Sequence, residues 1–430
     1  MTEAFLHYIW KYKLFNSPEL HTKSGEQIII HHSGTHNYGG GPDFLNARIR
    51  IGETMWAGHV EIHLHASDWH AHKHTDDVHY KNVVLHVVFD NDKEIHLHNP
   101  GDLQVLDLSG YIPQGQWNQY EHWLHSKSWI PCQAQLPGID MITWTNWKDR
   151  LLMERLEIKC KAVYEQLHKV NGDWSESFYR LLARNFGFKV NSDAMEMLAE
   201  SLPQSILAKH KSDPFQIEAL LFGQSGLLMQ IFSDEYPNDL KKEYEFLQKK
   251  YTLKTMNAAA WNFGRMRPSN FPTIRIAQFA ALICKSEHLF SALLETEWPN
   301  DIRKLFATEA HEYWNHNFRF DARTEDADMN KERNAKRIGD SSLNNILINT
   351  VAVVLFAYGR HCGNENLTER ALRLLETVEA EYNAIISNWQ LLGVNSTHAA
   401  DTQSLIHLYN NYCSEKKCLT CAVGLKALGR

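Results

Sequence analysis

The 430-residue chain contains no long hydrophobic run. No apolar stretch flanked like a signal peptide stands at its N-terminus, and its most apolar helix, residues 346–358, is too short to cross a bilayer and contains Asn349 and Thr350. The sequence also has no fixed-period repeat. These absences exclude a transmembrane protein and predict a soluble, cytoplasmic one without a membrane partner, and the length predicts two or three domains.

Cationic side chains are scarce in residues 1–125. This region holds 8 Lys and Arg against 15 Asp and Glu, a net charge of −7, whereas the remaining residues hold 36 of each sign. Nucleic-acid binding draws most of its affinity from cationic groups that neutralise phosphates, so this region alone is a poor binder of nucleic acid without a metal. It is rich in histidine instead, with 17 of the chain's 25.

Residues 1–125 predict an α/β domain. Several short runs alternate apolar and polar residues, as in strands with one buried face, and residues 83–89 are almost continuously apolar, as in a central strand covered on both faces. The predicted order is helix, three strands, short helical connection and strand, at residues 5–14, 27–32, 44–51, 56–64, 68–80 and 82–89, with a last strand at 106–108.

Two acidic residues stand on adjacent predicted strands. Asp43 opens the second strand, and Glu61, two residues before His63, sits near the end of the third. Period-two alternation places Glu61 and His63 on the same face. Two carboxylates in this arrangement are the ligands that a divalent metal needs for phosphodiester hydrolysis.

Pro42-Asp43 and Glu61-Ile62-His63 resemble the two signatures of the PD-(D/E)xK nuclease-like superfamily, whose core has the same order of elements. The resemblance implies a restriction-endonuclease-like core in which Asp43 and Glu61 hold a metal ion, usually magnesium, that activates water. The family's lysine is absent, and His63 stands in its place. Because histidine titrates near neutral pH and binds metal as a neutral ligand, activity would be sensitive to pH, and manganese or zinc would also suit the site.

The segment 70–79 adds four histidines and two aspartates. Imidazole and carboxylate groups could form a zinc site here. The alternative is a solvated polar loop. His70 is the nearest of these histidines in sequence to the third strand, and we expect it, or His32, to assist catalysis.

Beyond residue 125 the pattern becomes helical. Gly and Pro punctuate residues 110–113 and 131–138, which places a boundary near residue 125. We expect an all-α domain at residues 126–320 and a C-terminal helical region at 321–430, with a charged, Asn-rich loop at 321–340. The predicted helices include residues 141–166, 174–186, 192–201, 214–221, 238–251, 275–285, 289–294, 341–358, 368–391 and 402–413.

A loop in this region places arginines among aromatic residues. Arg265, Arg267 and Arg275 accompany Trp261, Phe263 and Phe271 in a segment that leads into a helix. This composition suits phosphate contacts and base stacking, and it predicts a nucleic-acid contact at the three arginines. The alternative is a rigid connection whose arginines pair with acidic neighbours.

Three cysteines, Cys413, Cys418 and Cys421, stand close together near the end of the chain. Their spacing predicts a zinc or iron–sulfur site, and the fourth ligand is expected to be Cys362, followed by His361 or His407. Several nucleases of the resembled fold hold an iron–sulfur cluster through one distant and three C-terminal cysteines, with a different spacing. The alternative is thiols packed at a helix–turn–helix. The other cysteines read as isolated residues: Cys132, Cys160 and Cys284.

Over its full length the chain resembles a bacterial family, seen especially in Bacteroidetes, that is known as a domain of unknown function. The matching segments are residues 41–44, 58–63, 67–69, 265–272 and 413–424. We therefore expect a bacterial cytoplasmic protein. The hypothesis for its function is a metal-dependent nuclease with magnesium or manganese at Asp43 and Glu61. The competing hypothesis is an inactive scaffold that binds nucleic acid or protein and holds a structural metal.

Overall fold

The computed structural model describes residues 1–15, 20–95, 103–112, 114–285, 288–320, 322–323 and 335–429. The chain divides into two compact units. Residues 1–147 and 408–430 form the first, called here the N/C unit, and residues 148–407 form the second, the helical unit. These junctions differ from the boundaries predicted near residues 125 and 320. The loop predicted at 321–340 lies largely outside the described residues.

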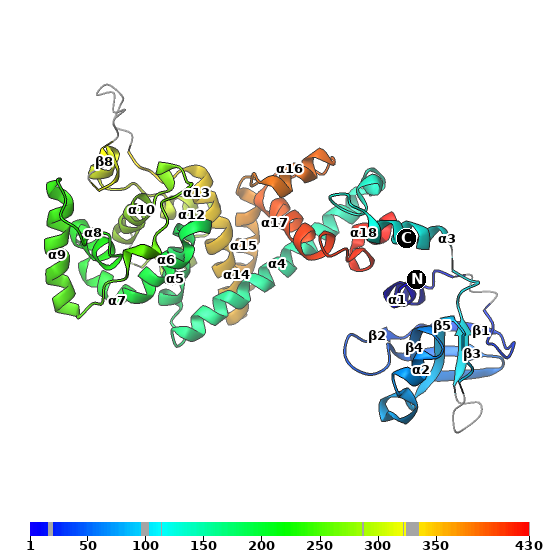
Figure 1. The fold of residues 1–430 in the computed structure, drawn as a ribbon. Helices are drawn as coiled ribbons and strands as arrows, with labels where there is room; N and C mark the ends of the chain where they lie inside the picture. Colours follow the sequence, from blue (N-terminus) through cyan, green and yellow to red (C-terminus); the bar gives the residue numbers. More distant parts are fainter. Residues whose placement is uncertain are drawn as a thin grey trace. The chain divides into compact units, whose positions relative to one another are not determined.

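The first part of the N/C unit contains a curled mixed sheet, with α1 beside it (Figure 1). Its strand order is β1-β3-β4-β5-β6, with β2 also paired to β3. Strands β1, β3 and β4 are antiparallel, whereas β5 and β6 run parallel to β4. The strands are β1 Ile28–His32, β2 Thr35–His36, β3 Phe44–Ile51, β4 Thr54–His65, β5 Val83–Asp90 and β6 Gln104–Asp107.

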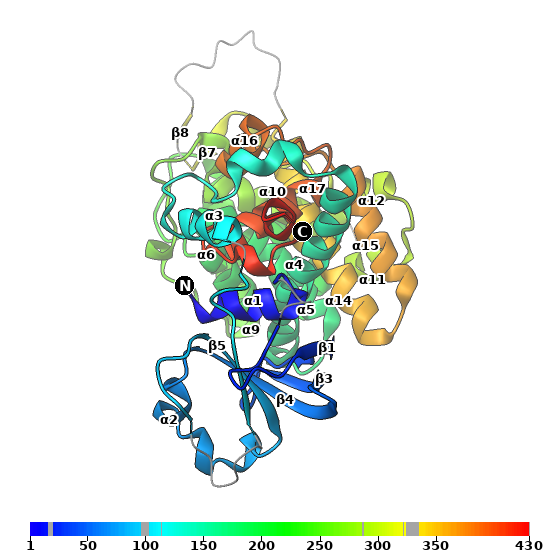
Figure 2. The ribbon, with the colours of Figure 1, turned by 90° about the vertical axis from the view of Figure 1, so that its right-hand side faces the viewer.

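The predicted strands are confirmed within a few residues. Residues 83–88 of β5 are all buried, as expected of a central strand, and the predicted interruption, His86, is fully buried with them. The β4–β5 connection consists of α2 (Asp68–Ala71) and two 3₁₀ turns, η2 (His74–Asp76) and η3 (Val78–Tyr80). Figure 2 shows α2 beside the sheet.

Helix α1 (Glu3–Tyr12) packs against β4. Thr2 caps it, because its Oγ1 accepts the Phe5 N–H at 3.3 Å. The Trp10 indole donates to the Ser33 carbonyl at 3.0 Å, and Lys13 Nζ donates to the Ile30 carbonyl at 2.8 Å. These bonds tie both the body and the end of α1 to the segment around β1.

The rest of the N/C unit comes from two distant parts of the sequence. Phe5 of α1 stacks on Tyr120 with ring centroids 5.3 Å apart, which joins the sheet side of the unit to α3. The remaining elements are α3 Gln114–His125, η4 Gln133–Gly138, the start of α4 (Met141–Lys169), η10 Tyr409–Cys413, η11 Cys418–Thr420 and α18 Ala422–Ala427.

The helical unit has one extended apolar core, formed by side chains of nearly all its helices. Helix α4 enters it from the N/C unit, and α17 leaves it. The prediction of one helix at 368–391 is wrong, because two helices occupy this range. Helix α15 ends at Thr377, Glu379 forms a bridge with His398, and α16 begins at Ala384. The helices are α5 Trp174–Phe186, α6 Phe188–Ser201, α7 Gln204–Leu207, α8 Pro214–Gln224, α9 Glu235–Tyr251, α10 Pro272–Lys285, α11 Leu289–Glu295, α12 Pro299–Phe306, α13 Asp340–Ile346, α14 Ala352–Cys362, α15 Glu365–Thr377, α16 Ala384–Leu391 and α17 Ala399–Leu408.

A π-helical turn at residues 347–351 joins α13 and α14 into a run of 23 residues, longer than predicted. Within the part of the chain that the structure describes, this is the one helical run long and apolar enough to cross a membrane. However, 78% of its most apolar window is buried inside the protein. A core helix of a soluble protein has the same character, so the fold is compatible with a soluble protein.

Candidate metal centre

The two predicted acidic residues lie side by side where the start of β3 pairs with β4. The Asp43 N–H donates to Glu61 Oε2 at 3.1 Å, and the Ile62 N–H donates to Asp43 Oδ2 at 2.9 Å. Each carboxylate therefore accepts a backbone hydrogen bond from the strand that carries the other. Glu61 is buried, and Asp43 is partly exposed. The predicted adjacency of the two carboxylates is confirmed.

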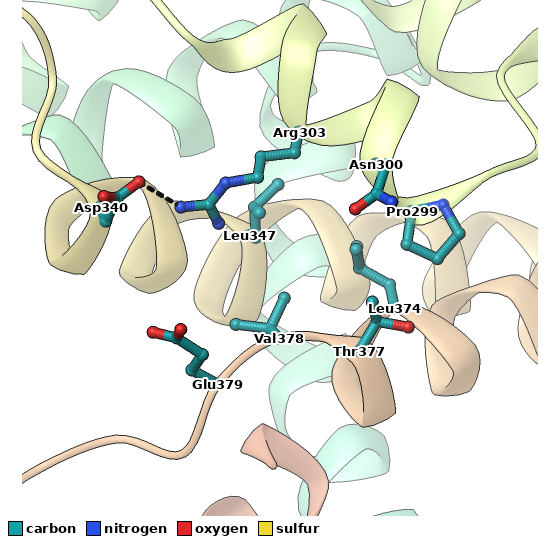
Figure 3. A pocket seen from close by; sticks show the side chains of 9 residues that line it. All are labelled: Pro299, Asn300, Arg303, Asp340, Leu347, Leu374, Thr377, Val378 and Glu379. Atoms are coloured by element: carbon teal, nitrogen blue, oxygen red, sulfur yellow. Dashed lines mark hydrogen bonds and ion pairs between the residues drawn. The ribbon is translucent and has the colours of Figure 1, made fainter.

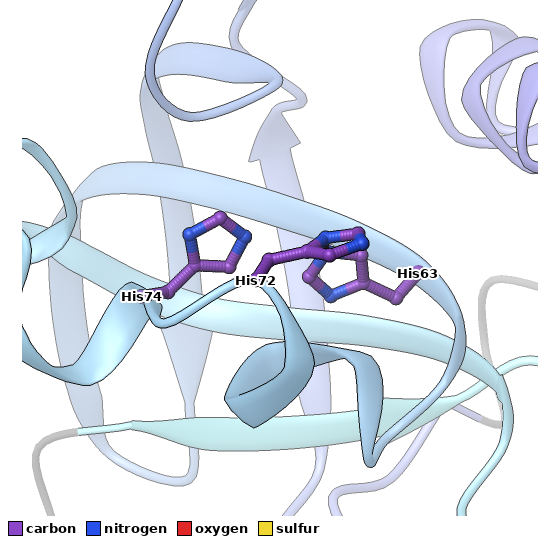
Figure 4. Close-up of side chains that lie close together, drawn as sticks. All are labelled: His63, His72 and His74. Carbon is purple, nitrogen blue, oxygen red and sulfur yellow. Dashed lines mark hydrogen bonds between the residues drawn. The ribbon is translucent and has the colours of Figure 1, made fainter.

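Two histidines contact Glu61, and a third contacts one of these two. His63 Nε2 lies 3.5 Å and His74 Nε2 lies 3.3 Å from Glu61 Oε1, while His72 Nδ1 lies 3.1 Å from His63 Nε2. One ring nitrogen from each histidine falls within 4.8 Å of the others (Figure 4), and of the three rings that of His72 is exposed. We call these four residues the histidine group. Three imidazoles suit zinc, and the carboxyl group of Glu61 lies beside two of them.

The environment of His74 fits a bound cation. This residue is buried, and its Nε2 makes no hydrogen bond although the atom is shielded from water. Buried polar atoms are nearly always satisfied, so an atom left in this state needs an explanation. Tyr80 stacks on the ring with centroids 3.8 Å apart, and Trp69 contacts it edge-on at 5.4 Å. These two rings hold Nε2 toward Glu61.

His86 is the outer partner of His63. Its Nε2 lies 2.9 Å from His63 Nδ1, and the ring is fully buried in β5. A cation on His63 Nε2 requires the ring proton to sit on Nδ1, where it can donate to His86. Histidines that bind metals usually donate their other N–H in this way, which fixes the tautomer and the ring orientation. His86, the one polar residue within the apolar run of β5, therefore belongs to the site as the partner of His63.

Burial dominates the electrostatics of the histidine group. It raises the pKa of Glu61 to about 8, with the nearby Asp43 charge as the second cause. It lowers the pKa of His63 to about 4 and that of His86 to about 3, and it also lowers the pKa of His74. The imidazoles of His63, His74 and His86 are thus neutral at physiological pH, with lone pairs available to a cation. The expected titration of His63 near neutral pH is wrong, because burial moves it below that range.

A second group lies on the other side of Asp43. His7 Nε2 lies 3.2 Å from Asp43 Oδ2 and 3.8 Å from Glu3 Oε1. Each of Glu3, His7 and Asp43 offers a ligand atom within 4.8 Å of the other two, and all three are partly exposed. Burial raises the pKa of Glu3. We call these residues the helix group, because two of them come from α1.

Sequence reasoning missed Glu3 and His7. The signal was present, since residues four apart lie on one face of a helix. The helix was predicted to begin at Phe5, however, which left Glu3 outside it. Thr2 shifts the beginning to Glu3 by capping.

The loop places its histidines differently from the prediction. His70 is exposed on α2, whereas His74 contacts Glu61 and His72, also exposed, contacts His63. In α2 the buried position is that of Trp69, and one residue further the side chain turns toward solvent. His32, the other predicted auxiliary, is exposed and accepts the Gly34 N–H at 3.1 Å. The predicted contribution of His70 is therefore corrected to His72 and His74.

The arginine loop is only partly available to a ligand. Arg265 and Arg267 are exposed. Arg275 is buried in α10, where it donates to Gln278 Oε1 at 2.9 Å and to Ser342 Oγ at 2.8 Å. Burial also lowers its pKa to about 10. Arg275 is a structural residue, so its predicted contact with nucleic acid is wrong.

The predicted fourth ligand of the cysteine site, Cys362, belongs to a different unit from the other three cysteines. Cys362 is exposed at the end of α14 in the helical unit, where its thiol interacts with Tyr358. Cys413, Cys418 and Cys421 belong to the N/C unit, and the thiol near them is that of Cys132. Cys132 was predicted to be isolated. The other two candidates, His361 and His407, contact Trp174 and Glu154 within the helical unit.

A pocket of about 290 Å³ opens between α12, α13 and α15 of the helical unit (Figure 3). Its guanidinium, from Arg303, is already paired with Asp340 and Asn344. The cationic side chain of this pocket is already paired, whereas each of the two groups at the sheet offers three ligand atoms that lie close together. The sheet is therefore the candidate site.

A family model described as "Protein of unknown function (DUF2851)" matches residues 3–384. The chain belongs to this family. The DUF2851 match spans both ligand groups, from Glu3 to His74, and it confirms the expected membership of a family of unknown function. No curated protein and no solved structure matches this DUF2851 chain.

Proposed function

We propose that this protein is a metal-dependent hydrolase of phosphodiester bonds in nucleic acid, acting in the bacterial cytoplasm. The observation that carries the proposal is the pair Asp43 and Glu61, each of which also contacts further metal-ligating side chains: Glu61 contacts His63 and His74, and Asp43 contacts His7. The order of elements supports it. A helix, three antiparallel strands, a crossover and a parallel strand resemble the PD-(D/E)xK core.

A bound divalent cation would polarise the scissile phosphate and lower the pKa of a water molecule. The helix group suits this task because Glu3, His7 and Asp43 are partly exposed and supply three ligands, which leaves coordination positions for phosphate and water. The buried histidine group suits a second cation. Cations at these positions would also offset the net charge of −7 in residues 1–125, which otherwise repels a polyanion.

His63 has a different role from the lysine of the resembled family. Its ring is joined to His86 and Glu61 and is neutral, so it binds a cation and does not supply a positive charge to the nucleophile. In the helical unit, Arg265 and Arg267 remain exposed and are proposed to contact phosphates.

The alternative function is that of a scaffold with a structural metal. One observation favours it. His63, His74 and Glu61 of the histidine group are buried, and a largely enclosed set of ligands is typical of structural zinc sites.

Cleavage assays with the full chain separate the two functions. Labelled single-stranded and duplex DNA and RNA are incubated with magnesium, manganese or zinc. Asp43→Asn should lower the cleavage rate at least about 100-fold, because it removes a charged ligand. Asp76→Asn, an exposed acidic residue of the same domain, is the matched control and should leave the rate unchanged. Wild-type protein that binds metal stoichiometrically but cleaves none of these substrates would favour the scaffold.

A further inference from the structure

Four cysteines gather in the N/C unit. Cys132 precedes η4, Cys413 ends η10, and Cys418 and Cys421 flank η11. All four are free thiols, three are buried and Cys413 is partly buried. Helix α18 packs against both η4 and η11, so the chain segments that carry the four thiols meet, and burial together with the neighbouring thiols raises the pKa of Cys132. These thiols come from two segments that are far apart in the sequence, so regular spacing along a single helix does not explain why they gather.

The two segments that carry these thiols are held together by contacts of several kinds. Trp129 stacks on Tyr409 with ring centroids 4.7 Å apart and planes inclined by 12°. Lys416, whose backbone is left-handed with φ 52°, donates from Nζ to the carbonyl oxygens of Leu124 and Ser126. These contacts fix the loop of Cys413–Cys421 against the chain that leads to Cys132.

A second set of contacts fixes the end of the chain. Lys426 of α18 pairs with Asp140 at 3.1 Å, and Trp147 meets Tyr412 edge-on at 5.4 Å. Together with the contacts of Trp129 and Lys416, these contacts hold in place the two chain segments that carry the thiols.

Cys421 is the N-cap residue of α18, and burial raises the pKa of its thiol to about 11. Gly424 has to be glycine for this turn, because a Cβ there would lie 2.4 Å from the Cys418 carbonyl oxygen. The backbone of α18 is thus packed directly against the residue that carries the Cys418 thiol.

The spacing of the sulfurs argues against a single zinc ion. A tetrahedral zinc–thiolate site has Zn–S bonds of about 2.3 Å, which keeps its sulfurs within about 4 Å of one another. Among the residues that the structure describes, the groups of metal-ligating atoms gathered within 4.8 Å are the histidine group and the helix group, not the cysteines. A larger centre, in which different cysteines bind different iron atoms, fits this wider arrangement.

We propose that Cys132, Cys413, Cys418 and Cys421 bind an iron–sulfur cluster that holds together the two chain segments of the N/C unit. The cluster links residues 132 and 413–421 directly, next to the ring and ion-pair contacts described above. The site is separate from the carboxylate centre, and the proposal does not depend on nuclease activity.

The experiment measures iron, acid-labile sulfide and visible absorbance of the full chain purified without oxygen. Wild-type protein should contain iron and sulfide in equal amounts and be brown. Cys132→Ser should lower the iron content at least about tenfold. Cys362→Ser, the exposed thiol of the helical unit, is the matched control and should retain wild-type iron. Asp43→Asn should also retain it, which separates this test from that of the proposed function.

Three outcomes would overturn the proposal. These are wild-type protein without iron, Cys132→Ser with a full iron content, and zinc in place of iron at the four thiolates. If Cys132→Ser does not fold, as judged by circular dichroism and gel filtration, the iron and sulfide content of wild type and of Cys418→Ser decides the question. Stoichiometric disulfides between these cysteines in the anaerobic protein would also contradict it.

Discussion

Lys73 lets His72 and His74 approach the same residue, His63. It separates His72 from His74 and has a left-handed backbone, with φ 61°. This conformation is costly for a residue with a Cβ and changes the direction of the chain within one residue. The two flanking rings can therefore both contact the His63 ring although they are only two residues apart. Such a change of direction has no periodic signal in the sequence.

The first prediction concerns the ligands of the histidine group. His74→Ala should weaken zinc binding more than about 100-fold, because loss of an outer partner alone costs about 10–100-fold. His70→Ala is the matched control, since His70 belongs to the same loop but is exposed. Calorimetric zinc titration of the full chain checks the difference. Equal affinities of the two variants would mean that the group does not bind zinc.

A second prediction concerns Glu218, which is buried in α8 and accepts a hydrogen bond from the Tyr236 hydroxyl at 2.6 Å. Burial raises its pKa to about 7. A carboxyl whose pKa is raised on folding stabilises the folded state below its unfolded pKa. That stability is lost as pH rises through about 4.5 to 7. The loss attributable to this group is at most about 3 kcal/mol.

Urea unfolding at pH 5 and pH 8 tests the direction of this change in stability with pH. Wild-type protein should lose more unfolding free energy between the two pH values than Glu218→Gln, which cannot ionise. Glu245→Gln replaces an exposed glutamate of α9 and should behave like wild type. An identical pH dependence in all three proteins would show that Glu218 is not the titrating group.

At the scale of elements, the strands of the sheet could be predicted well because their signals are local. Alternation along β4 and the apolar run of β5 identify both strands and their faces. Contacts between elements leave no such signal. The approach of His7 to Asp43 depends on how α1 packs on the sheet, and spacing along the chain does not encode it. For the same reason the carboxylate pair was found and the helix group was not.

Helix packing supplies a third prediction. Gly223 of α8 faces α9, and a Cβ at this position would lie 1.9 Å from the ring of Tyr244. That ring cannot withdraw easily because its hydroxyl donates to Gln224 Oε1 at 2.9 Å. Gly223→Ala should therefore destabilise the protein by about 1–3 kcal/mol or more through overpacking.

Gly115 of α3 is the control for this substitution. Nothing lies within 4 Å of a Cβ built there, so Gly115→Ala should be neutral or should stabilise by up to about 1 kcal/mol through the helix preference of alanine. Thermal unfolding followed by circular dichroism gives both values. A neutral Gly223→Ala would mean that α8 and α9 are less closely packed than the structure shows.

At the scale of the whole molecule, the helical unit is an insertion in the N/C unit. The chain leaves the N/C unit after Trp147 and returns at Leu408. The two crossing segments lie side by side, because the Ser404 hydroxyl donates to the Lys148 carbonyl at 2.8 Å within the helical unit. Boundaries read from composition miss this arrangement, since composition does not show that the chain returns.

A fourth prediction follows from this topology. Replacement of residues 148–407 by a short Gly/Ser linker should give a folded N/C unit, because Trp147 and Tyr412 already meet on its side of the crossing. Circular dichroism should show strand and helix, and the product should unfold in one cooperative transition. Zinc titration should still detect the histidine group. An aggregated or unfolded product would mean that the helical unit is needed for the N/C unit to fold.

The interrupted chain also sets an order of events during synthesis. Cys132 and Cys413 are 281 residues apart in the sequence, which at about 5–20 residues per second corresponds to roughly 15–60 s of translation. Throughout this interval the residues that Trp129 and Trp147 contact in the folded protein, Tyr409 and Tyr412, have not yet been synthesised, and neither has Cys413. The helical unit is made in the same interval and can fold first. The nascent sheet therefore has to stay soluble before residues 408–430 of the N/C unit are made. Any cofactor that binds both Cys132 and Cys413 can enter only after the second of these residues has emerged.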